Sequence, residues 1–122
     1  MAVTITLEFL ADAALRGNSR AHYMVKHSAA KKLKESGYWH GLIECVDLHL
    51  VPKISIRFTF YHWRKIDIDN LAIGMKAWCD GLVQAEVVED DDPDHVVYEA
   101  PEFVRCQKGE SRTVVEIKEV PR

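Results

Sequence analysis

The chain has 122 residues, 48% of them hydrophobic and 29% charged, which is typical of one ordinary soluble domain over residues 1–122. We expect neither a signal peptide at its start nor a membrane span, because no apolar run is long enough. Its three cysteines, Cys45, Cys79 and Cys106, are odd in number and far apart. This argues against a disulfide framework and favours the cytoplasm.

The net charge of −3 conceals a division along the chain. Residues 1–65 carry ten lysines and arginines against five acidic residues, and residues 66–122 carry six against fourteen. A basic surface suits phosphate groups, and an acidic pocket suits a metal ion. An ordinary solvated surface would explain this charge distribution equally well. The choice between the two interpretations therefore depends on the motifs.

The first half of the chain predicts two strands and a helix. Residues 3–9 alternate apolar and polar side chains, as a strand does. A helix is expected over 20–35, capped by Ser19 and closed at Ser36-Gly37. A short strand is expected within 41–50, and the clearest strand covers 54–61.

The second half predicts a helix over 70–85, an acidic loop over 90–93 and two final strands, 96–106 and 113–120. Residues 107–111 are expected to form a hairpin turn between these strands, and Pro101 indicates an edge position or a bulge. The pattern predicts an α+β domain with a mixed sheet of about four to five strands and two main helices.

The candidate site lies between the clearest strand and the second helix. Asp67 and Asp69 are two residues apart, so in extended backbone their carboxylates project to the same side. At about 100° per residue, Lys76 and Asp80 return to the helix face of Asp69. The opposite face carries the expected core stripe: Leu71, Met75, Trp78 and Leu82.

Carboxylates of this kind are the oxygen ligands that Mg²⁺ prefers, and a nearby lysine can stabilise a phosphoryl transition state. Each piece also has a simpler interpretation. Asp69 can cap the helix, Asp90 to Pro93 can be a solvated turn, and Lys76 can pair with Asp80.

The ordered set Asp67-Ile-Asp-Asn-Leu, Lys76, Asp80-Gly-Leu and Glu89-Asp90-Asp91 resembles the RusA family of phage-type Holliday-junction resolvases. The resemblance covers residues 64–97. It departs from the family pattern in three ways: Lys76 follows Asn70 by six residues rather than three, the usual arginine run is reduced to Arg64-Lys65, and Glu86 replaces a small glycine.

The resemblance implies an α+β homodimer that resolves four-way DNA junctions in recombination and repair. It would make paired phosphodiester cuts, leaving 5′-phosphate and 3′-hydroxyl ends. The implied cofactor is Mg²⁺, for which Mn²⁺ can substitute. The implied site consists of metal ligands Asp67, Asp69 and Asp91 with Asp90 close by, catalytic Lys76, and DNA-binding residues Asn18, Arg20, Arg64, Lys65 and Asn70. The alternatives are a nuclease of flap or other structured DNA, and a catalytically idle DNA-binding module of the same fold.

Overall fold

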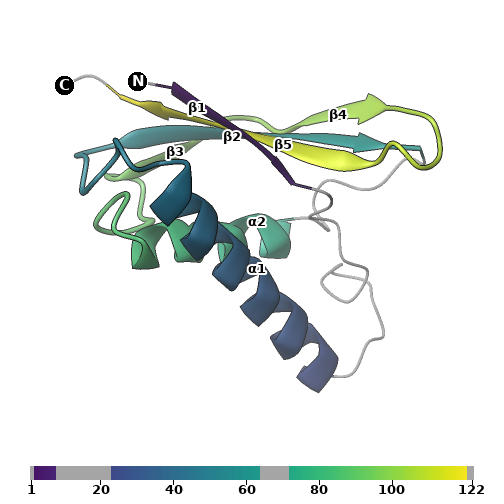
Figure 1. The fold of residues 1–122 in the computed structure, drawn as a ribbon, viewed down its shortest axis with the longest axis horizontal. Coiled ribbons are helices and arrows are strands. Elements are labelled where there is room, and N and C mark those ends of the chain that lie inside the picture. Colours follow the sequence, from purple (N-terminus) through teal and green to yellow (C-terminus); the bar gives the residue numbers. More distant parts are fainter. Residues whose placement is uncertain (1, 8–22, 64–71, 121–122) are drawn as a thin grey trace.

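The computed structural model describes residues 2–7, 23–63 and 72–120, which form two layers: a mixed sheet, and two helices on one of its faces (Figure 1). This confirms the expected α+β fold. The described elements are β1 (Ala2–Leu7), α1 (Tyr23–Ile43), β2 (Ile54–His62), α2 (Ala72–Gln84), β3 (Val96–Tyr98), β4 (Glu102–Arg105) and β5 (Arg112–Glu119).

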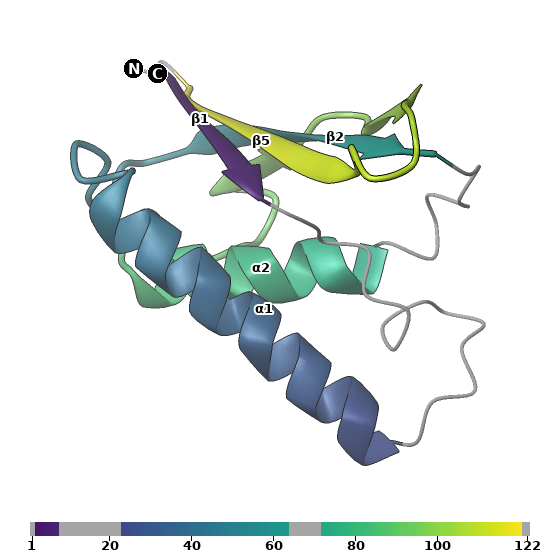
Figure 2. The ribbon, with the colours of Figure 1, turned by 45° about the vertical axis from the view of Figure 1, so that its right-hand side comes forward.

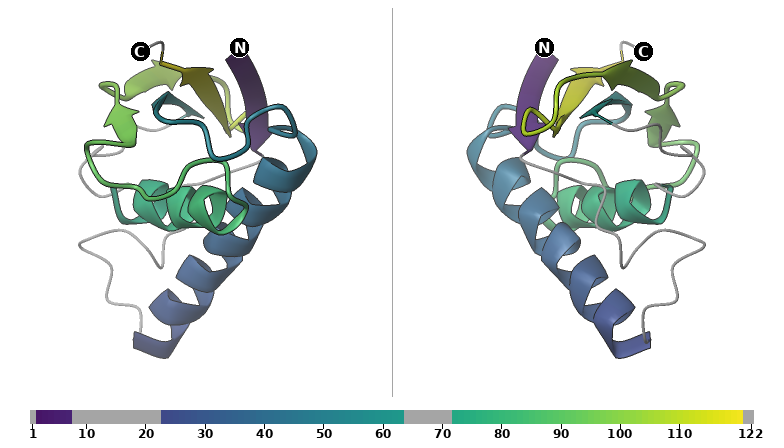
Figure 3. Two further views of the ribbon diagram at one scale, coloured as in Figure 1. Left: turned by 90° about the vertical axis from the view of Figure 1, so that its left-hand side faces the viewer. Right: turned by 90° about the vertical axis from the view of Figure 1, so that its right-hand side faces the viewer.

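The sheet has the order β1-β5-β2-β3, and β4 pairs with β2 beyond β3. β1 and β2 both run antiparallel to β5, whereas β3 and β4 run parallel to β2. α2 is therefore a crossover helix between the parallel strands β2 and β3. Both helices lie on the same side of the sheet (Figures 2 and 3), and the opposite face has no described element over it.

Alternation along β2 decides which side chains form the core. Ile54, Ile56, Phe58 and Phe60 are buried towards the helices, and the residues between them point to the other face. Trp78 of α2 is fully buried and meets Phe58 edge-on, with ring centroids 6.2 Å apart. The predicted core stripe is confirmed at Trp78 and Leu82; Met75 is partly buried against the core, and Leu71 lies outside the described residues.

The sequence predicted that the first helix ends at Ser36-Gly37, and this prediction was wrong. α1 continues to Ile43, because Gly37 lies where α1 crosses α2. A Cβ atom there would clash with the backbone carbonyl of Trp78, and one at Gly81 would clash with the carbonyl of Lys34. The glycine pair thus serves helix packing, and Trp78 Nε1 donates a hydrogen bond to Ser36 Oγ (3.2 Å) across the same crossing.

Gly37→Ala should lower the free energy of unfolding by about 1–3 kcal/mol, because the helices must separate to admit the methyl group. Urea unfolding measures this. Gly41→Ala is the matched control: its Cβ would meet side-chain carbons rather than backbone, so a smaller loss is expected. Replacing glycine by alanine at an exposed helix position usually raises stability. A gain in stability for Gly37→Ala would therefore contradict the role of Gly37 in the close packing of α1 on α2.

Two further expectations about the fold were wrong. Residues 41–50 form no strand: they hold the end of α1 and a series of turns in which Leu50 adopts a positive φ of 47°. The strands flanking 107–111 also form no hairpin, since β4 and β5 pair with opposite sides of β2. The apolar strand β2 lies between β4 and β5 in the sheet. The turn residues predicted correctly that the chain reverses, but they do not determine which strands pair.

The turn itself is present: Gly109 has a φ of 93°, and the Glu110 N–H bonds to the Gln107 carbonyl (3.1 Å). The expected edge position of Pro101 is confirmed, because it separates β3 from β4 along the edge beside β2. Neither described helix is long and apolar enough to cross a membrane.

Candidate active site

An ion pair joins α2 to the acidic loop that follows it. Lys76 Nζ lies 2.6 Å from Asp91 Oδ2; the lysine side chain is 67% exposed and the aspartate 19%. This hydrogen bond is the main reason that the pKa of Lys76 is raised and that of Asp91 is lowered. Both groups are therefore charged at neutral pH.

Asp80 brings a second carboxyl group to the pair. It lies one helical turn after Lys76, on the same face of α2, and its carboxyl group is a neighbour of Asp91. Burial is the main cause of the raised pKa of Asp80, and the neighbouring Asp91 adds to it. The structure brings Lys76, Asp80 and Asp91 together, and the ion-pair partner of Lys76 is Asp91 rather than Asp80.

The acidic loop contains both site-forming and turn-forming residues. Asp90 Oδ1 accepts the backbone N–H of Asp91 (2.7 Å), which fixes the loop beside the pair. Asp92 Oδ1 accepts the backbone N–H groups of Asp94 (3.0 Å) and His95 (3.1 Å) and the ring of His95 (2.6 Å). The histidine bond lowers the pKa of Asp92. The turn interpretation therefore fits Asp92.

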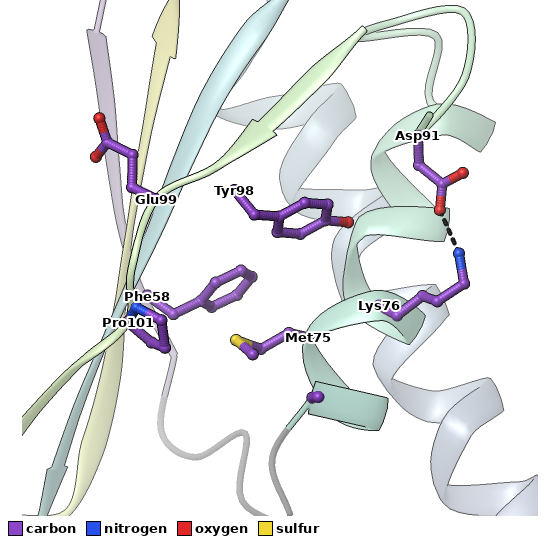
Figure 4. A pocket seen from close by; sticks show the side chains of 8 residues that line it. Phe58, Met75, Lys76, Asp91, Tyr98, Glu99 and Pro101 are labelled. Carbon is purple, nitrogen blue, oxygen red and sulfur yellow. Dashed lines mark hydrogen bonds and ion pairs between the residues drawn. The ribbon is translucent and has the colours of Figure 1, made fainter. Parts of the chain in front are cut away.

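A cavity of about 290 Å³ opens beside the ion pair (Figure 4). Phe58 and Pro101 line it on the sheet side, where Glu99 also lies, and Lys76 and Asp91 lie at the opposite side. The Tyr98 hydroxyl reaches across towards α2, where Cys79 is buried, and burial raises the pKa of Cys79 to about 12. The lining residues are Phe58, Ala72, Met75, Lys76, Asp91, Tyr98, Glu99 and Pro101.

A second hollow of about 390 Å³ lies on α2, lined by Ala72, Lys76, Ala77 and Asp80. Lys76 borders both spaces, so its ammonium group can reach a ligand in either of them. The long exposed stem of the side chain gives it this freedom. A charged, adjustable lysine between two hollows is a suitable group for contacting a phosphate.

Most of the other predicted site residues lie outside the part of the chain that the structure describes. The structure describes Lys76, Asp90 and Asp91 from the predicted set and brings them together. The undescribed ones are Asn18, Arg20, Arg64, Lys65, Asp67, Asp69 and Asn70. Sequence reasoning missed the apolar cavity, because Phe58 and Tyr98 meet only through the pairing of β2 with β3.

A magnesium ion needs several oxygen ligands close together. Over residues 2–7, 23–63 and 72–120, no group of three histidine, cysteine or acidic side chains is arranged to hold a metal. Asp80 and Asp91 supply two carboxyl groups beside one another, which is the ligand type that Mg²⁺ takes. These residues fit such an ion if Asp67 and Asp69, which precede α2, complete the set.

Comparisons with known proteins leave the family open. No protein-family model matches the chain, and no curated protein matches it. Among solved structures, the chain is similar to the thiamine-monophosphate kinase from Stenotrophomonas maltophilia K279a, with 14% identity and a TM-score of 0.37. The match covers 100% of this chain and 31% of the kinase chain, so the present chain spans about a third of that protein. A likeness this distant says nothing about activity.

Proposed function

We propose that the protein is a Mg²⁺-dependent, structure-specific endodeoxyribonuclease that resolves four-way DNA junctions. The observation that carries the proposal is the convergence of Lys76, Asp80 and Asp91 from two segments of the chain. These residues occupy the helix and the loop of the RusA-like motif, whose first part, Asp67 and Asp69, directly precedes α2.

The residues have complementary roles in this proposal. Asp67, Asp69 and Asp91 hold the ion, with Asp90 close by; Asn70 supports them. Bound there, Mg²⁺, or Mn²⁺ in its place, would supply the positive charge that polarises a phosphoryl oxygen and acidifies water.

Lys76 stabilises the extra negative charge that develops on the phosphate. Because the pKa of Asp91 is lowered, its carboxylate is already ionised when a cation arrives.

A four-way junction must be cut on two strands of like polarity, whereas one domain offers one site. A homodimer with two-fold symmetry supplies two sites related as the two strands are. The C-terminal strand β5 has no free edge for a dimer contact, because it pairs with β1 on one side and β2 on the other. Among the described strands, β1 and the β3–β4 side form the edges of the sheet. Apolar side chains are exposed where α1 ends: Trp39, Leu42, Ile43, Val46 and Leu50.

The setting expected for this enzyme is the cytoplasm. The three cysteines are free; Cys45 and Cys79 are buried, and burial raises the pKa of Cys45 to about 11. Unreactive, unpaired thiols of this kind suit a reducing compartment.

One cleavage assay tests the proposal. Labelled four-way junction, flap and plain duplex are incubated with the protein and Mg²⁺. We expect paired nicks in the junction, little cutting of duplex and a dimer by sedimentation at micromolar concentration. Mixed dimers with one Asp67→Asn subunit should nick a single strand.

The alternatives predict different results in the same assay. Equal cutting of flap and junction by a monomer would favour a general nuclease of structured DNA. Junction binding without any cleavage would favour the idle module, and cleavage in excess chelator would exclude the metal site.

A further inference from the structure

β2 ends beside the loop that joins β4 to β5 (Figure 1). Cationic and aromatic side chains lie around this end of the strand. Arg112 lies opposite Tyr61 in the β2–β5 register, and its guanidinium carbon is 4.0 Å from the centre of the tyrosine ring. Arg105 lies opposite His62 in the β2–β4 register, and its Nε donates to the Trp63 carbonyl (3.1 Å).

The loop contributes a third cation. Lys108 Nζ lies 5.4 Å from the centre of the Trp63 ring, which itself stacks on His62 with centroids 6.0 Å apart. We call this set the β2-end cluster: Tyr61, His62, Trp63, Arg105, Lys108 and Arg112.

The cations of the β2-end cluster are not neutralised by carboxylates within the described chain. Arg105 and Arg112 are held by backbone carbonyls and Lys108 by an aromatic ring. By contrast, Arg57 in the middle of β2 forms an ion pair with Glu116, with a distance of 2.6 Å between Nη2 and Oε2. The three exposed positive charges are held by neutral contacts and flank the end of β2 on both faces of the sheet, with Arg112 beside Tyr61 on one face and Arg105 beside His62 on the other. They are therefore available to an anion that passes over this end of the strand.

We propose that the β2-end cluster binds a DNA strand, with Arg105, Lys108 and Arg112 on successive phosphates and Trp63 against an unpaired base. The ligand class rests on the proposed function, and the location rests on the cluster itself. Cations beside half-buried rings match the alternation of phosphate and base in an opened strand. In the sequence, Trp63 directly precedes Arg64, and Asp67 and Asp69 follow a few residues later.

The sequence alone did not predict the β2-end cluster. Its three cations belong to residues 66–122, where fourteen acidic residues outweigh six basic ones. In the basic first half of the chain, Arg57 of β2 forms ion pairs with Glu116 and Glu102. The fold, rather than composition, assembles the basic site.

The test compares two substitutions on the same strand and the same face of β5. Arg112→Gln removes a charge from the β2-end cluster; Lys118→Gln removes one from an exposed position about 20 Å away along the strand. Anisotropy of a fluorescent four-way junction is measured in chelator, so that no cleavage occurs. Arg112→Gln should weaken binding about threefold to tenfold and reduce the salt slope by about one, whereas Lys118→Gln should change neither.

The aromatic part is tested with labelled oligothymidylate. Trp63→Leu should weaken binding about tenfold, and Trp63→Phe should restore most of it, because a ring remains for stacking. Thermal unfolding verifies that each variant is folded. Equal effects of Arg112→Gln and Lys118→Gln would overturn the proposal, as would competition by polyglutamate as strong as by oligothymidylate.

The outcome separates this inference from the proposed nuclease. If the Arg112 and Trp63 variants lose binding but the wild type cuts nothing, the DNA surface stands and the nuclease fails. If the wild type cuts junctions and the variants bind normally, the nuclease stands and this surface is wrong.

Discussion

Asp91→Asn should abolish junction cleavage while leaving folding and DNA binding almost unchanged. The carboxylate of Asp91 is partly exposed and pairs with the exposed Lys76, so it contributes little to the core. An exposed pair of this kind contributes at most about 1 kcal/mol to stability. Loss of a charged metal ligand should lower the single-turnover cleavage rate by at least about a thousandfold. The same loss is expected for Asp67→Asn and Asp69→Asn.

Asp94→Asn is the matched control for this prediction. It removes the same charge from an exposed position in the same loop, where the backbone N–H rather than the side chain makes the described hydrogen bond. The control should retain full activity. Full activity of Asp91→Asn, or loss of its folded structure, would contradict the assignment. Titration with Mg²⁺ then shows whether any residual rate reflects weaker ion binding.

Local sequence patterns predicted the elements that depend on local periodicity. The alternation over β2 and the stripe of Trp78 and Leu82 identified the core faces, because burial follows the period of a strand or a helix. The same periodicity placed Lys76 and Asp80 on one face of α2. Asp91 joins them through the loop, which the ordered motif had indicated.

Long-range packing explains what the sequence did not predict. Gly37 has the signature of a helix end, yet its missing side chain serves the crossing with α2, and only the position of Trp78 reveals this. The pairing of β4 and β5 with opposite sides of β2 is likewise a property of the whole sheet. The β2-end cluster depends on that pairing, because Arg105 and Arg112 reach the end of β2 from its two sides.

Lys76→Met should slow the chemical step about a hundredfold and change junction affinity less than about threefold, since one electrostatic contact to the transition state is lost. Stability should change little, because the side chain is exposed opposite the core stripe. Single-turnover cleavage under saturating protein separates the rate from binding. Lys31→Met, a lysine at an exposed position of α1, controls for the loss of surface charge.

The pH dependence then distinguishes two roles for Lys76. Its hydrogen bond is the main reason that the pKa of Asp91 is lowered, so in Lys76→Met this pKa should rise. Protons then compete with Mg²⁺ at higher pH, and the acidic limb of the rate profile should move upward. If the lysine acts only by keeping Asp91 ionised, alkaline pH and excess Mg²⁺ should restore the full rate. We expect excess Mg²⁺ to move the acidic limb of the pH–rate profile back towards its wild-type position. The maximal rate at alkaline pH should remain below that of the wild type, because the lost ammonium group also stabilises charge on the phosphate.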